Sequence, residues 1–282
     1  MRVVVAMSGG VDSSVAAALL KQAGHEVIGV TMEIWPASTG TGTGGQAGAC
    51  CGLAAVEDAR KVARKLGIPH YVFNLREVFA RHVIDNFCQE YAQGRTPNPC
   101  VRCNRYVKFD ALLARVRALN AAFLATGHYA RITRDETSGR FLLRKGVDRQ
   151  KDQSYFLYTL TQDQLQHILF PLGQLTKKRV RQIARELDLP VAAKAESQEV
   201  CFIPDNDYHR FLRRCIPGSL QEGPIVDQQG RVLGRHRGIA FYTVGQRRGL
   251  GIAAGKPLYV LAVDREHNAV VVGPESALYR AA

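Results

Sequence analysis

An apolar segment near the start of the chain runs into a turn of glycine and serine, and this junction limits the possible folds most strongly. Residues 3–7 read VVVAM, residues 8–14 read SGGVDSS, and residues 15–20 read VAAALL. The pattern predicts a strand, a tight turn and a helix. Glycines let the backbone approach an anion, and the first N–H groups of a helix favour negative charge. The junction therefore predicts a phosphate-binding turn and a nucleotide ligand, with a glycine-rich turn that binds nothing as the alternative.

The first part of the chain alternates strand-like and helical patterns, as the βαβ units of a parallel sheet require. The strand-like runs are residues 3–7, 26–32, 71–74 and 123–126. An apolar stripe at helical spacing lies between the last two runs and predicts core packing. Its members are Val78, Phe79, Val83, Ile84, Phe87 and Tyr91. We expect residues 1–150 to form a doubly wound α/β domain with a parallel sheet.

The pattern changes after residue 150, which predicts two further regions. Residues 151–215 favour short helices at 153–159, 162–170 and 176–187, the last with Thr176 as its N-cap. Residues 216–282 predict a small β domain, because apolar runs alternate there with glycine-rich turns. Its expected strands are residues 224–227, 240–244, 258–263 and 269–272.

The charge and the cysteine content restrict the class of protein. A formal net charge of +13 favours a polyanionic partner such as RNA or DNA. Basic clusters that could contact phosphates are Lys177-Lys178-Arg179, Arg213-Arg214, Arg235-His236-Arg237 and Arg247-Arg248, although each alone is typical of a solvated surface. Seven cysteines, an odd number, fit reduced thiols better than a secreted disulfide framework. With no membrane-spanning run or signal region, we expect a cytoplasmic protein that does not act at a membrane.

Two further segments carry candidate chemistry. Residues 38–48 are rich in Gly, Ser and Thr, which predicts either an active-site loop or a linker without function. Residues 94–104 read GRTPNPCVRCN, and they present Cys100 and Cys103 as a Cys-x-x-Cys pair. Disulfide chemistry, zinc and an iron–sulfur cluster are all open for this pair, with Cys201 as the natural third cysteine. Cys50-Cys51 could contribute or could simply begin a helix.

Several motifs together resemble a known family. The SGGVDSS turn is similar to the PP-loop of ATP pyrophosphatases, and it lacks the G-x-x-x-x-G-K-[ST] lysine of kinases and GTPases. Nearly the whole chain is similar to the tRNA-specific 2-thiouridylase family. The motifs that carry this resemblance are residues 8–14, residues 94–99 with Cys103-Asn104, ATGHY at 125–129, KDQSYFLY at 151–158, CFI at 201–203 and YTVGQRRGLG at 242–251.

The resemblance implies an adenine nucleotide alpha hydrolase-like fold and an ATP-dependent tRNA sulfurtransferase. ATP, with Mg, would adenylate the C2 oxygen of the wobble uridine, and sulfur would then displace AMP. The implied tRNAs are of the glutamate, lysine and glutamine type. The implied sulfur donor is a cysteine desulfurase, a sulfur relay protein or free sulfide.

The resemblance also implies roles for single residues. Cys103 would be the nucleophile and Cys201 the persulfide carrier. The implied ATP-binding residues are Ala6, Met7, Ser8, Gly9, Gly10, Val11, Asp12, Ser13, Met32 and Gly127. The implied tRNA-binding residues are Asn98, Pro99, Cys100, His128, Lys151, Asp152 and Gln153. A buried structural histidine is the alternative for His128.

The chain departs from the family pattern at two places. Cys100 stands where the bacterial pattern has an aspartate, so Cys100, Cys103 and Cys201 form a possible catalytic and metal-binding set for a 4Fe-4S cluster. A two-cysteine persulfide relay is the alternative. The family also continues into a further β-barrel, most of which we expect this sequence to lack.

Two other functions fit parts of the sequence. A PP-loop enzyme that amidates or thiolates a small molecule would keep residues 8–14 but has no use for the basic clusters or the three cysteines. A non-catalytic RNA-binding module would explain the charge but needs neither a nucleotide turn nor reactive cysteines. The dependence of pyrophosphate release on tRNA separates these possibilities.

Overall fold

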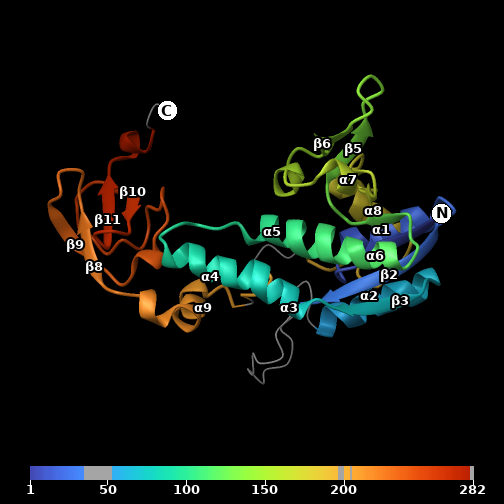
Figure 1. The fold of residues 1–282 in the computed structure, drawn as a ribbon, viewed down its shortest axis with the longest axis horizontal. Helices are drawn as coiled ribbons and strands as arrows, with labels where there is room; N and C mark the ends of the chain where they lie inside the picture. The colour runs from blue at the N-terminus through green and yellow to red at the C-terminus, as the bar shows by residue number, and fades with distance from the viewer. Residues whose placement is uncertain (35–52, 196–199, 204, 280–282) are drawn as a thin grey trace. The chain divides into compact units, whose positions relative to one another are not determined.

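The computed structural model describes residues 1–34, 53–195, 200–203 and 205–279, and the side chain of residue 219 is outside the description. The segment 38–48 and Cys50-Cys51 therefore lie outside the described residues. The chain forms two compact units (Figure 1). The first contains Met1–Val83 and Cys100–Pro204, and the second contains Ile84–Pro99 and Asp205–Ala282. The three-region division at residues 150 and 215 follows different boundaries and stays a prediction.

The first unit is built on a five-stranded sheet with the order β3-β2-β1-β4-β7, in which every neighbouring pair is parallel. Its strands are β1 (Arg2–Ala6), β2 (Glu26–Glu33), β3 (His70–Asn74), β4 (Phe123–Ala125) and β7 (Ile168–Leu169). Its helical segments are α1 (Val11–Gln22), α2 (Leu53–Leu66), α3 (Arg76–Phe79), η1 (Ala80–Ile84), α5 (Pro99–Arg102), η2 (Cys103–Leu112), α6 (Leu113–Ala118), η3 (Ser154–Leu157), α7 (Gln162–Leu165) and α8 (Lys177–Glu186). A separate hairpin joins β5 (Ala130–Arg134) to β6 (Phe141–Lys145).

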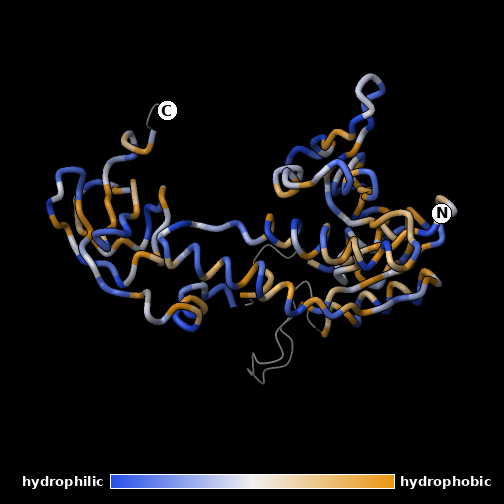
Figure 2. Tube along the Cα trace, viewed as in Figure 1, coloured by the Kyte–Doolittle hydropathy of each residue, from blue (hydrophilic) through white to orange (hydrophobic). Residues whose placement is uncertain are grey.

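The central strand β1 is buried on both faces, which is why it reads as a continuous apolar run. Val3 and Val5 belong to a core cluster that includes residues of α1, α2 and α8. Val4 is also fully buried but is not in that cluster, so it packs on the opposite face. The strands and helix near the N-terminus are accordingly coloured as hydrophobic in Figure 2. The predicted doubly wound α/β fold is confirmed.

The second unit combines helices with a small sheet, as expected for the end of the chain. Its sheet has the order β10-β11-β8-β9, with β11 and β8 parallel and the other pairs antiparallel. The strands are β8 (Gly223–Val226), β9 (Val232–His236), β10 (Tyr259–Asp264) and β11 (Ala269–Gly273). The helical segments are α4 (Asp85–Ala92), α9 (Tyr208–Cys215), η4 (Pro217–Ser219), η5 (Ile239–Phe241) and η6 (Glu275–Leu278).

Two local predictions were wrong, and one strand of the small sheet was missed. The expected helix at 162–170 ends at Leu165, because Ile168 and Leu169 form a short edge strand against Leu124 and Ala125. The expected strand at 240–244 begins instead as a 3₁₀ turn whose apolar residues are buried, and burial alone does not separate a strand from a turn. Strand β9, which has two exposed apolar residues and a glycine, was not predicted.

The expected helix at 176–187 is present as α8. Its N-cap is Thr176, whose side chain accepts a hydrogen bond from the backbone N–H of Arg179 at 3.3 Å. The cap satisfies a backbone donor that has no partner within the helix. This prediction is confirmed.

Candidate active site

The glycine–serine turn connects β1 to α1 in the first unit. Gly9 has φ +66°, and a Cβ there would lie 2.3 Å from the backbone oxygen of Ala55 in α2. Gly10 is the N-cap of α1 and has no side chain that could occupy the space before the helix. The turn therefore depends on glycine, and it leaves the first backbone N–H groups of α1 available to an anion.

Serine side chains fix the shape of this turn. The backbone N–H of Ser8 donates to Oγ of Ser13 at 3.1 Å, and Oγ of Ser14 donates to the oxygen of Gly10 at 2.7 Å. Ser13 and Ser14 are both buried. A turn fixed before its ligand arrives binds that ligand with less loss of conformational entropy.

The turn lies where the strand order reverses, between β1 and β4. Ligands of open α/β sheets bind at such switch points, beyond the carboxyl ends of the strands. Gly127 follows β4, and a Cβ there would lie 2.7 Å from the backbone nitrogen of Ser13. Met32 lies near the carboxyl end of β2 and is buried. The structure thus places Gly127 against residues 6–13 and puts Met32 on the neighbouring strand, at the same edge of the sheet.

Two residues that the sequence analysis did not assign to this site contact Asp12. The ammonium of Lys177 lies 2.7 Å from each carboxylate oxygen of Asp12, and the hydroxyl of Tyr129 donates to Oδ1 at 2.7 Å. Lys177 was predicted as part of a basic surface cluster, yet it is buried. The sequence did not indicate this contact, because Asp12 and Lys177 are 165 positions apart.

A second lysine contacts the turn from the same part of the chain. The ammonium of Lys194 donates to the backbone oxygen of Gly9 at 3.0 Å and to Oδ2 of Asp58 at 2.7 Å. Asp58 lies in α2. Lys194 therefore links the turn to the helix that packs against Gly9, a role that no sequence motif indicated.

The Cys-x-x-Cys pair lies at the start of an irregular helix. Cys100 is in α5 and exposed, and Cys103 begins the π-helical segment η2 and is half-buried. The next residue, Asn104, is 2% exposed; its side chain donates to the oxygen of Phe156 at 3.1 Å and accepts from Lys108 at 2.9 Å. These bonds anchor the helix beside Cys103. π-Helical turns occur often at functional sites.

Cys201 lies on another segment of the first unit. It is half-buried and precedes Phe202 and Ile203, which are both buried. The Phe202 ring packs edge-on against Phe79 with the ring centroids 5.7 Å apart. These apolar contacts hold the backbone next to the Cys201 thiol.

The three cysteines were tested as ligands of a cluster. Cys100, Cys103 and Cys201 all lie in the described part of the chain, and no group of three His, Cys, Asp or Glu side chains in that part could hold a metal ion. The 4Fe-4S cluster on these three cysteines is thus not shown and stays a prediction, and we derive no step through it.

His128 is held within the first unit. Its Nδ1 lies 2.6 Å from Oγ1 of Thr126, and its ring packs against Phe109 and Phe170. Burial, together with the positive charge of Lys108, lowers the pKa of His128 well below its ordinary value. The imidazole is therefore neutral at pH 7 and would contact RNA as a hydrogen-bonding group rather than as a cation.

The predicted tRNA-binding residues 151–153 are shaped by internal hydrogen bonds. Asp152 accepts from the backbone of Gly146 at 2.8 Å and from Oγ of Ser154 at 2.8 Å. Gln153 bonds both backbone groups of Tyr129, at 3.0 Å through its side-chain oxygen and at 2.9 Å through its N–H. Gln153 thus positions the tyrosine that contacts Asp12.

Asn98 and Pro99 belong to the second unit, and the residues just before them are held by contacts with other segments of that unit. Gly94 has φ +70°, and a Cβ there would lie 2.5 Å from Cγ1 of Val263. The hydroxyl of Thr96 donates to that of Thr243 at 2.9 Å. The YTVGQRRGLG motif therefore supports the segment that leads to Asn98.

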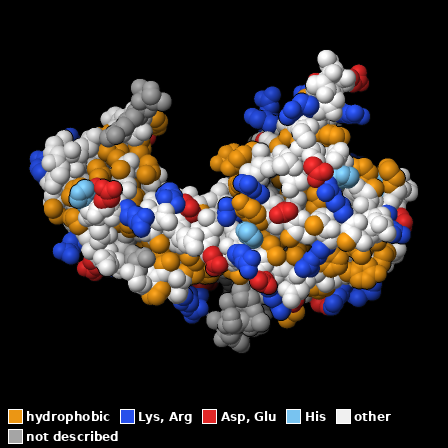
Figure 3. All heavy atoms as spheres, in the orientation of Figure 1, with side chains coloured by type: hydrophobic (Ala, Val, Ile, Leu, Met, Phe, Trp, Pro, Cys, Tyr) orange, Lys and Arg blue, Asp and Glu red, His pale blue; other side chains and the backbone are white. Residues whose placement is uncertain are grey.

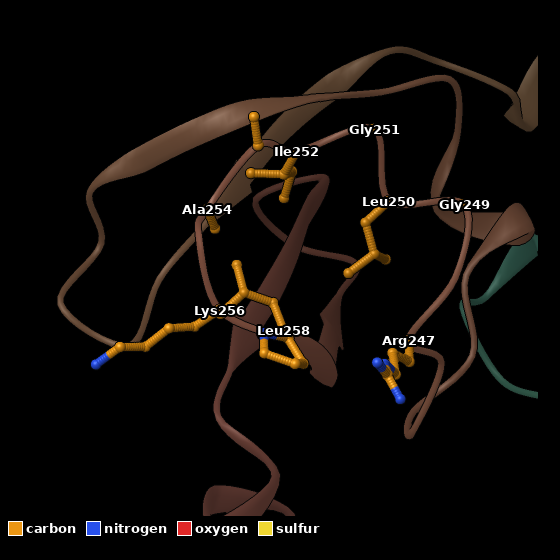
Figure 4. A pocket seen from close by; sticks show the side chains of 10 residues that line it. Arg247, Gly249, Leu250, Gly251, Ile252, Ala254, Lys256 and Leu258 are labelled. Carbon is orange, nitrogen blue, oxygen red and sulfur yellow. The ribbon is translucent and has the colours of Figure 1, made fainter.

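The last part of the YTVGQRRGLG motif borders a pocket of about 440 Å³ in the second unit. Figure 4 shows Leu250 and Leu258 in its middle and the basic side chains of Arg247 and Lys256 at opposite ends. Lys and Arg side chains are also spread over the face shown in Figure 3. His236, however, is buried and bonds Asn268 and Gly238, so it does not contribute to a phosphate-binding surface. No helix in the described residues is long and apolar enough to cross a membrane.

Comparison with known proteins agrees with this geometry. Residues 1–205 match the model described as "tRNA methyl transferase HUP domain", and residues 209–274 match "tRNA methyl transferase PRC-barrel domain". The chain is 58% identical over 277 residues to tRNA-specific 2-thiouridylase MnmA of Heliobacterium modesticaldum, covering 98% of this chain and 71% of the relative. The chain belongs to the tRNA-specific 2-thiouridylase family.

Another member of this 2-thiouridylase family, from Pelotomaculum thermopropionicum, is 56% identical over 278 residues. The aligned region is 99% of this chain and 76% of the relative. Among solved structures, a 4-thiouridine synthetase–RNA complex with bound ATP matches with TM-score 0.43 and 16% identity, over 77% of this chain and 51% of that chain. The resemblance to the 2-thiouridylase family inferred from the motifs is confirmed.

Proposed function

We propose that the protein is an ATP-dependent tRNA uridine 2-sulfurtransferase. In the first step the C2 oxygen of the wobble uridine attacks the α-phosphate of ATP, and pyrophosphate leaves. In the second step sulfur replaces the adenylated oxygen, and AMP leaves. The observation that supports this proposal best is the turn at residues 8–14, fixed at the switch point of the sheet in a chain 58% identical to a 2-thiouridylase.

The ATP site consists of residues 6–13 with Met32 and Gly127. The backbone N–H groups at the start of α1 bind phosphate oxygens, and Gly127 lets the segment after β4 pack directly against Asp12 and Ser13 because it has no Cβ. Mg²⁺ is usually held by one or two carboxylates together with substrate phosphates. Asp12 is the carboxylate in the turn that fits this role.

Cys103 and Cys201 carry out sulfur transfer. We assign Cys103 as the nucleophile and Cys201 as the carrier of a persulfide, whose outer sulfur comes from the persulfide of a cysteine desulfurase or a relay protein. Free sulfide would bypass the persulfide and attack the adenylated C2 carbon directly. A carbonyl oxygen leaves poorly until it is adenylated, whereas a persulfide is a good nucleophile near neutral pH. The two half-buried thiols lie beside anchored residues, Asn104 and Phe202.

The substrate is a tRNA of the glutamate, lysine or glutamine type, and the thiolation takes place in the cytoplasm. Asn98, Pro99 and Cys100 contact the target base, and His128 with residues 151–153 contacts the rest of the tRNA. The net charge of +13 supports a polyanionic substrate. Base contact by Cys100 uses a thiol where the family pattern has a carboxylate.

The test is thiolation of unmodified glutamate or lysine tRNA with ATP, with either sulfide or a persulfide donor as the sulfur source. One sample is reconstituted anaerobically with iron, and a matched sample is kept free of iron. We expect tRNA-stimulated pyrophosphate release and, with the persulfide donor, 2-thiouridine formation in both samples, which supports the two-cysteine relay.

Thiolation only with iron would instead establish a 4Fe-4S cluster on Cys100, Cys103 and Cys201. Pyrophosphate release stimulated by a small molecule and not by tRNA would overturn the proposed substrate. An absence of pyrophosphate release would overturn the enzyme assignment and favour a binding module.

A further inference from the structure

We propose that Lys177 is the side chain that binds the pyrophosphate portion of ATP. The proposal rests on the function proposed above and names a residue that it leaves unassigned. A P-loop supplies its phosphate-binding lysine from within the loop. Residues 8–14 contain no lysine, so a lysine that binds the β- and γ-phosphates has to come from elsewhere in the fold.

The position of Lys177 fits this role. Its ammonium lies 2.7 Å from both oxygens of Asp12, in the first turn of α1. The backbone N–H groups at the start of the same helix form the predicted phosphate site. The ammonium is therefore close to the place where the phosphates bind, and its side chain is 11% exposed.

The surroundings of Lys177 disfavour a cation that serves structure alone. Lys177 is the first residue of α8, whose positive dipole end repels a positive charge. Its backbone N–H donates to Asp148 at 2.9 Å, and Thr176 caps the same helix end. A buried ion pair contributes little net stability, because desolvation offsets the attraction between the charges. A buried lysine at this location is better explained by an anionic ligand.

Asp12 gives a second reason for a cation at this point. A carboxylate at the start of α1 repels the phosphates of ATP unless a positive charge lies beside it. Lys177 contacts both of its oxygens, and the hydroxyl of Tyr129 donates to one of them. Lys177 thus lowers the repulsion by Asp12 and places a positive charge beside the predicted phosphate site.

The other nearby lysine has a different environment. Lys194 donates to the backbone oxygen of Gly9 and to Asp58, so it fixes the turn to α2. Lys194 is a positioning residue in this arrangement. Lys177 is the lysine that faces the first turn of α1.

Binding measurements on the full chain test the proposal. Isothermal titration calorimetry measures the affinity of Lys177→Met for MgATP, inorganic pyrophosphate and AMP. Loss of a charge-assisted contact corresponds to about a tenfold to hundredfold weaker affinity. We expect that loss for ATP and pyrophosphate and a change of less than about twofold for AMP, which lacks the β- and γ-phosphates.

Lys65→Met is the matched control, because Lys65 pairs with Asp188 at 2.9 Å on the surface. It should leave all three affinities unchanged.

Equal weakening of AMP and ATP, or unchanged ATP affinity in Lys177→Met, would overturn the proposal. Thermal unfolding monitored by circular dichroism identifies a variant that fails to fold, and Lys177→Gln then replaces it. Pyrophosphate release by the wild-type chain with tRNA is measured in parallel. If it occurs while Lys177→Met binds ATP normally, the proposed function stands and only the role of Lys177 fails.

Discussion

The phosphate-binding turn and the cysteine segments of the first unit are built in different ways. The turn joins a buried strand to a regular helix, and Asp12, Ser13 and Ser14 are all held by side-chain hydrogen bonds. Cys103 begins a π-helical segment, and Cys201 lies in a turn. Adenylation needs its reacting groups held in a fixed position. In the proposed relay, sulfur transfer uses two thiols that lie on separate segments. The comparison predicts that the two chemical steps can be separated by mutation.

The largest effect is expected at Asp12, which belongs to the turn. Asp12→Ala removes the partner of the buried Lys177 and the carboxylate that fits Mg²⁺, so both steps should be lost. We expect tRNA-stimulated pyrophosphate release to fall about a thousandfold or more. The isosteric Asp12→Asn keeps the shape and serves as the folding control. Full pyrophosphate release in both variants would contradict the assigned site.

Cys201→Ser should separate the steps. Thiolation should stop, because serine cannot carry a persulfide, while pyrophosphate release stays within about threefold of wild type because the turn is unchanged. Mass spectrometry of the tRNA and a pyrophosphate assay measure the two steps. Cys215→Ser, in the second unit, is the matched control and should retain both. Equal loss of both steps in Cys201→Ser would refute its role as carrier.

Gly127→Ala tests how closely the turn is packed. The new Cβ would lie 2.7 Å from the backbone of Ser13 and 2.8 Å from that of Asp12, so one of the two segments has to move. A displacement of about 1 Å costs on the order of a hundredfold in rate. Gly218→Ala, where a Cβ meets nothing within 4 Å, is the control. Wild-type pyrophosphate release in Gly127→Ala would show that the contact is not critical.

The smallest effect is expected at the cap of α8. Thr176→Ala removes the hydrogen bond to Arg179 and should lower the free energy of unfolding by about 1 kcal/mol. Urea denaturation measures this change, and Thr176→Ser should restore most of the stability. A loss of ATP affinity larger than this loss of stability would show that the cap also positions Lys177.

Local patterns predicted much of the first unit. The buried strands of its sheet appear as apolar runs, and the glycine–serine turn follows the first of them. The family resemblance, rather than the local pattern, assigned residues 6–13 and Gly127 to one site, and the structure places Gly127 against Asp12 and Ser13. The apolar run at 240–244 was misassigned because hydrophobicity indicates burial and not backbone conformation.

The contacts that the sequence could not predict join distant segments. Lys177 and Tyr129 contact Asp12, although they are 165 and 117 positions away from it in the sequence. The sequence of the basic cluster at 177–179 also does not indicate whether Lys177 is buried or exposed. The cysteines show a related limit. Their pattern suggested a cluster, which stays a prediction because no three His, Cys, Asp or Glu side chains of the described chain form a metal-binding group. Motifs indicate chemical type, whereas three-dimensional packing decides which groups meet.

The route of the chain through the two units has a practical consequence. Helix α4 comes from the first third of the sequence, yet its aromatic residues pack on α9, near residue 210. The rings of Phe87 and Phe211 have centroids 5.9 Å apart, and those of Tyr91 and Tyr208 lie 6.2 Å apart. A fragment cut near residue 205 would keep α4 and lose its partners. If the segments before and after residue 205 were expressed as separate proteins, the first would expose the aromatic side chains of α4 and would be prone to aggregate. A protein that contains the second unit alone has to include residues 84–99 as well as the segment from residue 205 onward.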